Sequence, residues 1–200
     1  MSSLSEFLEA SAARHQHLCP RQVLGVRMGM RAAVELGLDL PQSDKRVYAF
    51  VETDGCLVDG IVAATGCHVG RRTMQIVDFG KVAATFVDTA SGTALRIFPH
   101  PESRHAALRY APGESDSWHA QLTGYQVMPD EALLVVQPVE LKVSMAAIIS
   151  QPGLRAVCAQ CGEEIMNERE VVHGGIVLCR SCAGERYYQV REQPAVLSQG

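Results

Sequence analysis

Four cysteines near the C-terminal end constrain the fold of this chain more than any other feature of its sequence. Cys158 and Cys161 form one C-x2-C pair, Cys179 and Cys182 form a second, and 17 residues separate the two pairs. Each pair bends one tight turn around an ion, and four thiolates supply the tetrahedral shell that zinc prefers. The spacing therefore predicts a zinc site in a zinc ribbon or treble clef over residues 157–190.

The residues between and after the cysteine pairs fit such a module. Residues 169–178 place Gly174 and Gly175 between two β-branched runs, which predicts a hairpin, and residues 183–190 can form a helix. A module of fewer than about 40 residues buries too little apolar surface to fold unaided, so we expect the zinc to be structural. Three arginines against five glutamates in residues 157–190 favour contact with a protein over contact with a nucleic acid.

The rest of the chain has the composition of a folded domain. Apolar residues make up 47% of the 200, and charges interrupt every apolar run well short of the roughly 20 residues that span a bilayer. The N-terminal residues lack the pattern of a secretory signal, and seven cysteines are an odd number for a disulfide framework, which favours a reducing compartment. A formal net charge of -4 gives no attraction to a phosphate backbone. We therefore expect a cytoplasmic protein that binds neither membranes nor nucleic acids.

The order of the elements indicates an α+β core over residues 1–150. The patterns predict helices over 3–14, 20–37, 56–64 and 117–125, and strands over 46–53, 74–77, 81–87, 93–98 and 130–141. Short turns join three of the strands, so we expect an antiparallel sheet with packed helices. A linker is predicted over 151–156 and a polar tail over 191–200. Residues 99–145 give no functional signal.

The three remaining cysteines each lie where a predicted helix begins or ends. Cys19 and Cys56 begin helices, where the positive end of the helix dipole favours a thiolate, so we expect a lowered thiol pKa for both. His17 and Cys19 offer two ligands from one bend, and Cys67 follows Gly66 in a loop that could approach them. Thiolates with imidazole suit zinc, nickel or iron. A free cysteine is also commonly a small buried apolar side chain, so this second site is a hypothesis.

Three blocks of residues resemble the FmdE family, which takes its name from a component of formylmethanofuran dehydrogenase. The first is HQHLCPR at 15–21, which resembles the family pattern HGHxCPG; the second is VETDGCLVDG at 51–60, and the third is TGCHVG at 65–70. Many family members also end in a four-cysteine zinc module. Gln16 and Arg21 replace the two glycines of the first block here, which is expected to stiffen the bend.

The resemblance implies a fold, a partner and a metal site. It implies an α+β core that forms a homodimer, and a second metal ion of the zinc, nickel or iron class. The implied ligands come from the histidine and cysteine blocks, namely His17, Cys19, Cys56 and Cys67, with Cys67 as a fourth or outer partner. Whether His15 or Asp59 joins them stays open. The family name reflects gene neighbourhoods, so a reaction does not carry over.

Three functions follow from these observations. The first is a metal-binding accessory protein in molybdenum- or tungsten-type metalloenzyme metabolism or metal handling. The second is an enzyme in which Cys19 is a thiolate nucleophile with His17 or His15 as base, or in which an open metal site activates a substrate. The third is a scaffold whose zinc module binds a partner protein. The sequence favours the first.

Overall fold

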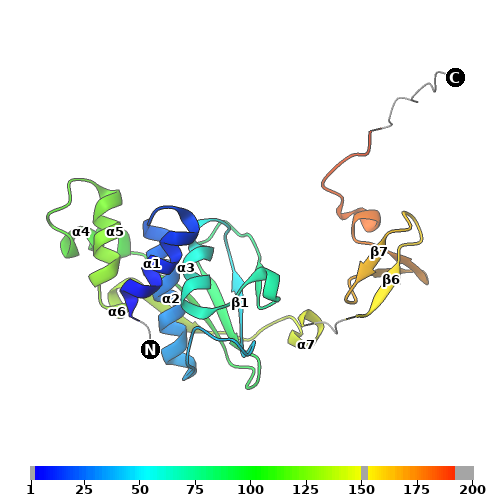
Figure 1. Ribbon diagram of the computed structural model, residues 1–200, viewed down its shortest axis with the longest axis horizontal. Helices are drawn as coiled ribbons and strands as arrows, with labels where there is room; N and C mark the ends of the chain where they lie inside the picture. The colour runs from blue at the N-terminus through cyan, green and yellow to red at the C-terminus, as the bar shows by residue number, and fades with distance from the viewer. Residues whose placement is uncertain (1–2, 150–152, 192–200) are drawn as a thin grey trace. The chain divides into compact units, whose positions relative to one another are not determined.

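The computed structural model describes residues 3–149 and 153–191, apart from the side chain of His15. The chain divides into two compact units, one ending at Lys142 and the other beginning at Val143. The first unit contains helices α1 to α6 and a five-stranded sheet, and the second contains α7 (Met145–Ile148) and two hairpins (Figure 1). Residues 151–152 of the predicted linker and 192–200 of the predicted tail lie outside the described residues.

The sheet of the first unit mixes antiparallel and parallel pairing. Its strands are β1 (Val47–Val51), β2 (Met74–Ile76), β3 (Ala84–Asp88), β4 (Ala94–Pro99) and β5 (Leu134–Pro138), in the spatial order β2-β1-β3-β4-β5. β1 pairs antiparallel with β3, β3 with β4, and β4 with β5. β1 and β2 run parallel, because helix α3 (Cys56–Thr65) connects them as a crossover. The α+β class is confirmed, but the sheet is not wholly antiparallel as predicted.

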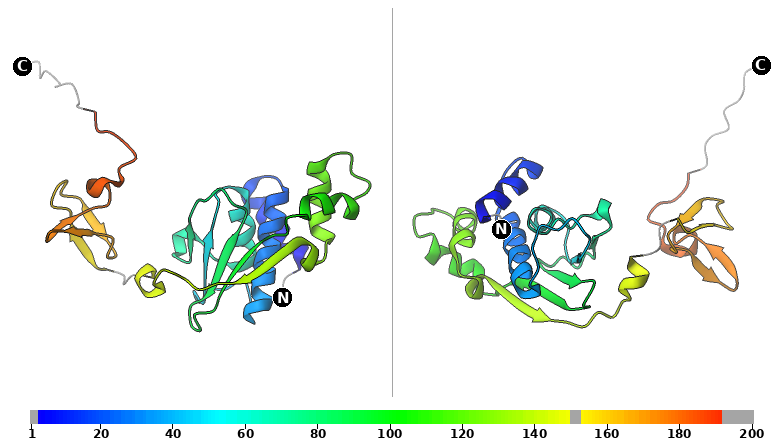
Figure 2. Two further views of the ribbon diagram at one scale, coloured as in Figure 1. Left: turned by 180° about the vertical axis from the view of Figure 1, so that it is seen from behind. Right: turned by 60° about the horizontal axis from the view of Figure 1, so that its bottom comes forward.

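Helix α2 (Pro20–Leu36) is the central element of the first unit. It packs against β3 and β4 and against α3, and α1 (Leu4–His15) packs on both helices, as Figure 2 shows from two further sides. Val23, Val26 and Met28 of α2 are fully buried, as are Phe86 and Ile97 of the sheet. Each such side chain contributes about 1.5–3 kcal/mol by leaving water. No helix among the described residues is long and apolar enough to cross a membrane.

Of the three helices between β4 and β5, two differ from the sequence expectation. Helix α4 (Ser103–Tyr110) was not predicted, and it buries only Ser103, Ala106 and Ala107, too narrow a face for a periodic apolar signal. Helix α5 (Ser117–Val127) matches the predicted helix. Residues 130–133, predicted as strand, form helix α6 (Asp130–Leu133), because Pro129 allows a helical turn to start before the strand.

Two hairpins form the described part of the second unit after α7. β6 (Arg155–Val157) pairs with β7 (Glu164–Met166), and β8 (Val171–His173) pairs with β9 (Ile176–Leu178). The predicted second hairpin is confirmed, and Gly174 and Gly175 turn it with φ values of 58° and 82°. The predicted helix over 183–190 is wrong: only a short turn over Ser181–Glu185 forms, and Gly184 interrupts it with φ 112°.

Candidate metal centres

The four cysteines of the second unit converge on one point. Their four sulfur atoms lie within 4.8 Å of one another, and the Sγ atoms of Cys161 and Cys179 are 3.9 Å apart. A tetrahedral zinc ion with bonds of about 2.3 Å places its sulfur ligands about 3.8 Å apart, so the arrangement fits zinc. A closed shell of four thiolates leaves no position for a substrate. The sequence prediction of a structural zinc site therefore agrees with this geometry.

The electrostatics of the four thiols explain why a cation belongs there. Backbone amides of Cys161 and Cys179 hydrogen-bond the Cys158 sulfur and lower the pKa of that thiol to about 6. Desolvation and the neighbouring thiols raise the pKa of Cys182 to about 12. Without a metal, the protein favours one thiolate, at Cys158, and additional thiolates in the cluster would repel it. A divalent cation removes this repulsion and lets all four ionise.

The second candidate site begins at the bend between α1 and α2. α1 ends at Gln16, whose φ of 66° is left-handed, and Cys19 is the extended residue that precedes Pro20, the first residue of α2. The backbone N–H of Cys19 donates to Gln22 Oε1 at 2.7 Å. The other end of the buried Gln22 amide donates to the carbonyl and hydroxyl oxygens of Ser11 in α1, both at 3.1 Å. Gln22 therefore fixes the position of Cys19 relative to both helices.

A glycine contact between α2 and α3 brings the second thiol to the same place. A Cβ atom on Gly25 would lie 2.3 Å from the Leu57 carbonyl oxygen, and one on Gly60 would lie 2.2 Å from the Gln22 carbonyl oxygen. Gly29, one turn further along α2, faces Ala64, one turn further along α3. The helices therefore run in the same direction with their backbones in contact. Their N-terminal ends carry Cys19 and Cys56.

The two thiols and His17 line one open pocket of about 500 Å³. Cys19 is 7% exposed, Cys56 is half-buried and His17 is exposed at the rim. The Cys56 thiol hydrogen-bonds the Cys19 thiol. The structure thus brings together three of the four residues that the sequence assigned to this site. The remaining lining residues are Pro20, Arg21, Leu24, Val82, Pro99, Ser103, Arg104, Ser117, Trp118, Gln121 and Tyr125.

The lowered pKa predicted for Cys19 is wrong. Burial raises the pKa of this thiol, and the neighbouring Cys56 thiol raises it further. The backbone amides of Gln22 and Arg21 at the start of α2 do lower it, as expected for a helix N-terminus, but their effect is smaller. In the metal-free protein Cys19 is therefore favoured as a thiol, and a bound cation would be needed to favour the thiolate.

Cys67 lies apart from the pocket. It is fully buried, its thiol donates to the Val47 carbonyl oxygen at 3.4 Å, and Gln42 Nε2 donates to its sulfur at 3.3 Å. Burial raises the pKa of this thiol to about 11. These contacts, and its absence from the pocket lining, correct the expectation that Cys67 approaches Cys19: in this structure it is a core side chain. Asp59 does not line the pocket either, and the His15 side chain lies outside the described residues.

The wall of the pocket opposite the cysteines comes from α4 and α5, which the sequence analysis did not connect to the site. The Tyr125 hydroxyl donates to Gln121 Oε1 at 3.2 Å, and the side chains of Ser103 and Arg104 also hydrogen-bond it. Burial raises the pKa of Tyr125, and the hydrogen bonds to Ser103 and Arg104 oppose that rise. No spacing in the sequence indicates that these residues face the cysteines, because α4 and α5 reach them only through tertiary packing.

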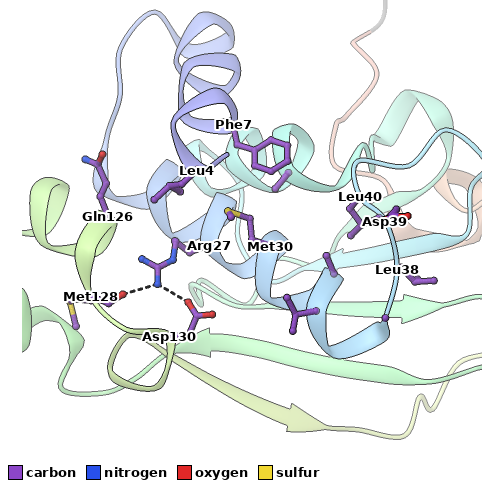
Figure 3. Close-up of a pocket in the computed structure, with 14 residues that line it drawn as sticks. Leu4, Phe7, Arg27, Met30, Leu38, Asp39, Leu40, Gln126, Met128 and Asp130 are labelled. Atoms are coloured by element: carbon purple, nitrogen blue, oxygen red, sulfur yellow. Dashed lines mark hydrogen bonds and ion pairs between the residues drawn. The ribbon is translucent and has the colours of Figure 1, made fainter. Parts of the chain in front are cut away.

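Arg27 of α2 anchors the C-terminal end of α5, and Figure 3 shows its contacts with Met128 and Asp130 beside a second, larger cavity. Its guanidinium donates to the carbonyl oxygens of Tyr125 and Met128, each at 2.7 Å, and to Asp130 at 2.6 Å. A cation at the C-terminal end of α5 satisfies the last carbonyls of the helix and its dipole. The second cavity, of about 770 Å³, has mainly apolar side chains and neither cysteine nor histidine in its lining. Arg27 therefore matters to the cysteine pocket by anchoring Tyr125.

An α+β core with a paired-thiol pocket, followed by a four-cysteine module whose geometry fits zinc, defines a class of metal-binding protein. Residues 14–135 match the family described as FmdE, molybdenum formylmethanofuran dehydrogenase operon. The chain belongs to the FmdE family, which confirms the resemblance in its sequence. Residues 153–188 match the prokaryotic dksA/traR C4-type zinc finger.

Two relatives extend this comparison. The chain is 30% identical over 214 residues to a probable S-adenosyl-L-methionine-binding protein of Archaeoglobus fulgidus, and the match covers 93% of this chain but only 55% of that protein. The crystal structure of an FmdE-like protein from Syntrophus aciditrophicus, named for a tungsten formylmethanofuran dehydrogenase, superposes with a TM-score of 0.59 at 22% identity. That match covers 94% of this chain and 96% of the other, and it establishes the shared fold.

Proposed function

We propose that the core pocket is a second metal site, with Cys19, Cys56 and His17 as protein ligands. The observation that carries the proposal is the contact of two thiols from separate helix starts, in an open pocket with an imidazole at its rim. Two thiolates and an imidazole are a soft ligand set that suits zinc, nickel or iron. Three protein ligands leave a coordination position open, unlike the closed shell of the zinc module.

Membership of the FmdE family supports an accessory role in metalloenzyme metabolism or metal handling. The family description refers to the operon of a molybdenum enzyme, and the solved relative is named for a tungsten enzyme. The Archaeoglobus fulgidus relative is nearly twice as long as the matched region, so its S-adenosyl-L-methionine ligand is not proposed for this chain. A protein that holds a transition metal in an open site is suited to deliver it or to sense it.

Metal analysis of the purified full-length protein tests the proposal. We expect one zinc ion in the module and one further metal ion in the core. Cys19→Ser and Cys56→Ser should each remove the core metal and keep the zinc, whereas Cys161→Ser should have the opposite effect. Cys67→Ser is the matched control, because its thiol is bonded inside the core. Full metal content in both the Cys19 and Cys56 variants would contradict the proposed site.

The size of the pocket favours an enzyme as the second candidate function. A volume of about 500 Å³ is more than a metal ion needs, and Arg104, Trp118 and Gln121 line it beside the thiols. A metal in the open site would supply Lewis-acid activation, while these side chains would bind and orient a substrate. The 7% exposure of Cys19 disfavours this residue as a free nucleophile.

Iodoacetamide should therefore modify the half-buried Cys56 before Cys19. Rapid and selective labelling of Cys19 would instead favour Cys19 as the nucleophile.

Exposed apolar side chains on the zinc module favour a partner protein as a third candidate. Val172, Ile176 and Tyr187 are 64%, 55% and 96% exposed. Removal of residues 155–200 should leave the core folded if the module serves only to bind a partner, and should unfold the core if the module stabilises it. The homodimer and the cytoplasmic location stay predictions; light scattering on the full-length protein measures the first.

A further inference from the structure

A smaller cavity adjoins the cysteine pocket and shares part of its wall. Its volume is about 320 Å³, and four residues line both cavities: Val82, Pro99, Ser103 and Arg104. The cysteine pocket alone, at about 500 Å³, falls within the range typical of small-molecule sites. Because the two cavities meet at Arg104, a single ligand can occupy both. We call the two together the cysteine cleft.

The charged side chains that line the cysteine cleft are cationic. Arg21 lines the larger cavity, Lys81 and Arg96 line the smaller, and Arg104 lines both; no carboxylate of the described residues lines either. The whole chain carries 22 acidic and 18 basic residues, so the cleft is opposite in sign to the protein. We propose that the cysteine cleft binds a small organic anion, with a phosphate or carboxylate group at Lys81 and Arg104 and the organic part beside Cys19 and Cys56.

Three of the four cations are available for a ligand. Arg96 donates two hydrogen bonds to the buried Glu52, at 2.6 and 2.7 Å, so its charge is already neutralised. No carboxylate in the described part of the chain forms an ion pair with Arg21, Lys81 or Arg104. Arginine presents a planar fork that matches phosphate and carboxylate oxygens, and lysine adds a compact charge.

The two carboxylates that directly precede lining residues of α4 and α5 are directed elsewhere. Asp116 Oδ1 accepts hydrogen bonds from the backbone amides of Trp118 and His119, at 2.9 and 3.0 Å, and so caps its own helix. Glu102, which precedes Ser103, pairs with His105 at 3.8 Å. Neither lines the cleft. These two carboxylates therefore do not neutralise the cationic side chains of the cleft.

The cleft also has the polar donors and the apolar surface that an organic anion requires. Ser103 is 2% exposed, and its side chain and that of Arg104 both hydrogen-bond the buried Tyr125 hydroxyl, which fixes Arg104 at the junction of the cavities. His100 Nδ1 accepts from the Glu102 amide at 3.2 Å, so in the neutral ring Nε2 carries the proton as a donor. Trp118, 44% exposed, supplies an aromatic surface in the larger cavity.

The anion site rests on the proposed function only for the metal that Cys19 and Cys56 would hold beside the ligand. Binding of the anion itself does not require that metal. Titration calorimetry on the full-length, metal-loaded protein tests it with three probes of similar shape: phenyl phosphate, benzoate and neutral benzamide. We expect saturable binding of at least one of the two anions and none of benzamide. The preferred anion identifies the acidic group as phosphate or carboxylate.

Two arginines of α4 provide the matched variants. Arg104→Gln should weaken binding of the preferred anion about tenfold or more, the loss expected for one charged hydrogen bond. Arg109→Gln changes the same charge on the same helix outside both cavities and should leave the affinity unchanged. Lys81→Gln should weaken binding as Arg104→Gln does.

Three results would overturn the anion site: benzamide binding as well as the anions, no saturable binding of either anion, or equal affinities in the Arg104 and Arg109 variants. The Cys19→Ser, Cys56→Ser double variant separates this inference from the proposed function. It should lose the core metal and still bind the anion. If the double variant keeps its full metal content and still binds the anion, the metal site is contradicted and the anion site is not. If Arg109→Gln abolishes anion binding and Arg104→Gln does not, the anion site is contradicted and the metal site is not.

Discussion

The two units of this protein are stabilised by different means. The first unit encloses an apolar interior in which side chains of α2, α3 and the sheet, such as Val23, Leu57 and Phe86, have no exposed surface. Among the described residues of the second unit only Cys158 and Ile165 are buried. At about 1.5–3 kcal/mol for each buried large side chain, the second unit gains too little to offset the entropy of ordering its hairpins. One unit therefore depends on packing and the other on a metal.

Removal of zinc should unfold the second unit and leave the first unit intact. Apparent binding energies of about 10–16 kcal/mol hold comparable zinc modules together, so Cys161→Ser should unfold residues 155–178 completely. Hydrogen exchange measured by mass spectrometry should show lost protection in β6 to β9 and unchanged protection in β3. Retained protection in β8 and β9 would mean that the hairpins do not depend on the metal.

The opposite test adds one methyl group to the core. In Gly60→Ala the new Cβ would lie 2.2 Å from the Gln22 carbonyl oxygen, so α2 and α3 must separate. We expect a loss of about 2–3 kcal/mol in the free energy of unfolding, since overpacking outweighs the better helix propensity of alanine. The proposed core metal should be lost as well, while the zinc module stays folded.

Urea unfolding followed by circular dichroism measures this loss. Gly113→Ala is the control, because a Cβ there meets nothing within 4 Å. Equal midpoints for the two variants would show that the helices can move apart without cost, and that the glycine contact does not set their separation.

An ion pair at the edge of the core gives it a dependence on pH. Hydrogen bonds from Arg46 hold the pKa of Asp88 well below its usual range, with help from Ser91 and the Ala90 amide. The pair therefore stabilises the folded state above about pH 4, the ordinary pKa of aspartate, and this contribution is lost as the pH falls toward the folded-state pKa.

Asp88→Asn should accordingly cost about 2 kcal/mol at pH 7 and less at pH 2. Thermal unfolding over this pH range measures the effect, with the exposed Asp39→Asn as control. If the variant and the natural protein lose stability in parallel as the pH falls, the ion pair is not the source of the pH dependence.

The smallest expected effect concerns the bend before Cys19. Gln16 has a φ of 66°, a conformation that glycine adopts without steric cost, and the family pattern has glycine there. Gln16→Gly should raise the free energy of unfolding of the core by about 0.5–1 kcal/mol. Gln16→Ala should give no gain, because alanine meets the same steric conflict. Equal stability of the two variants would show that the left-handed residue is not strained.

Local signals were readable from the sequence, and they located most of the candidate sites. The predicted helices over 3–14, 20–37 and 56–64 match α1, α2 and α3 closely, because a capping box of Ser3 and Glu6 begins α1, Pro20 begins α2 and Gly66 ends α3. The C-x2-C spacing predicted the four-cysteine cluster, whose two pairs lie within one short module. Cys19 and Cys56 were identified as helix starts. These features share one property, which is that each is decided within a few residues.

Features set by distant contacts were not readable. The sequence shows Cys67 next to a glycine. It does not show that the Cys67 thiol hydrogen-bonds Gln42 and the Val47 carbonyl oxygen inside the core. The parallel pairing of β1 with β2 depends on the path of α3 across the sheet. Arg104 and Tyr125 line the pocket because Arg27, about a hundred positions earlier in the chain, holds the end of α5. No periodicity or spacing carries that information.

The glycine contact between α2 and α3 has a consequence for how this site can vary. The separation of the two helix starts is set by peptide backbone meeting peptide backbone at Gly25 and Gly60. Backbone dimensions are the same in every protein, whereas side-chain contacts change with each substitution. The distance between the helix starts that carry Cys19 and Cys56 therefore depends on this backbone contact and not on the side chains elsewhere in the core. Substitutions around the two thiols that keep Gly25 and Gly60 should therefore leave the separation of the helix starts unchanged.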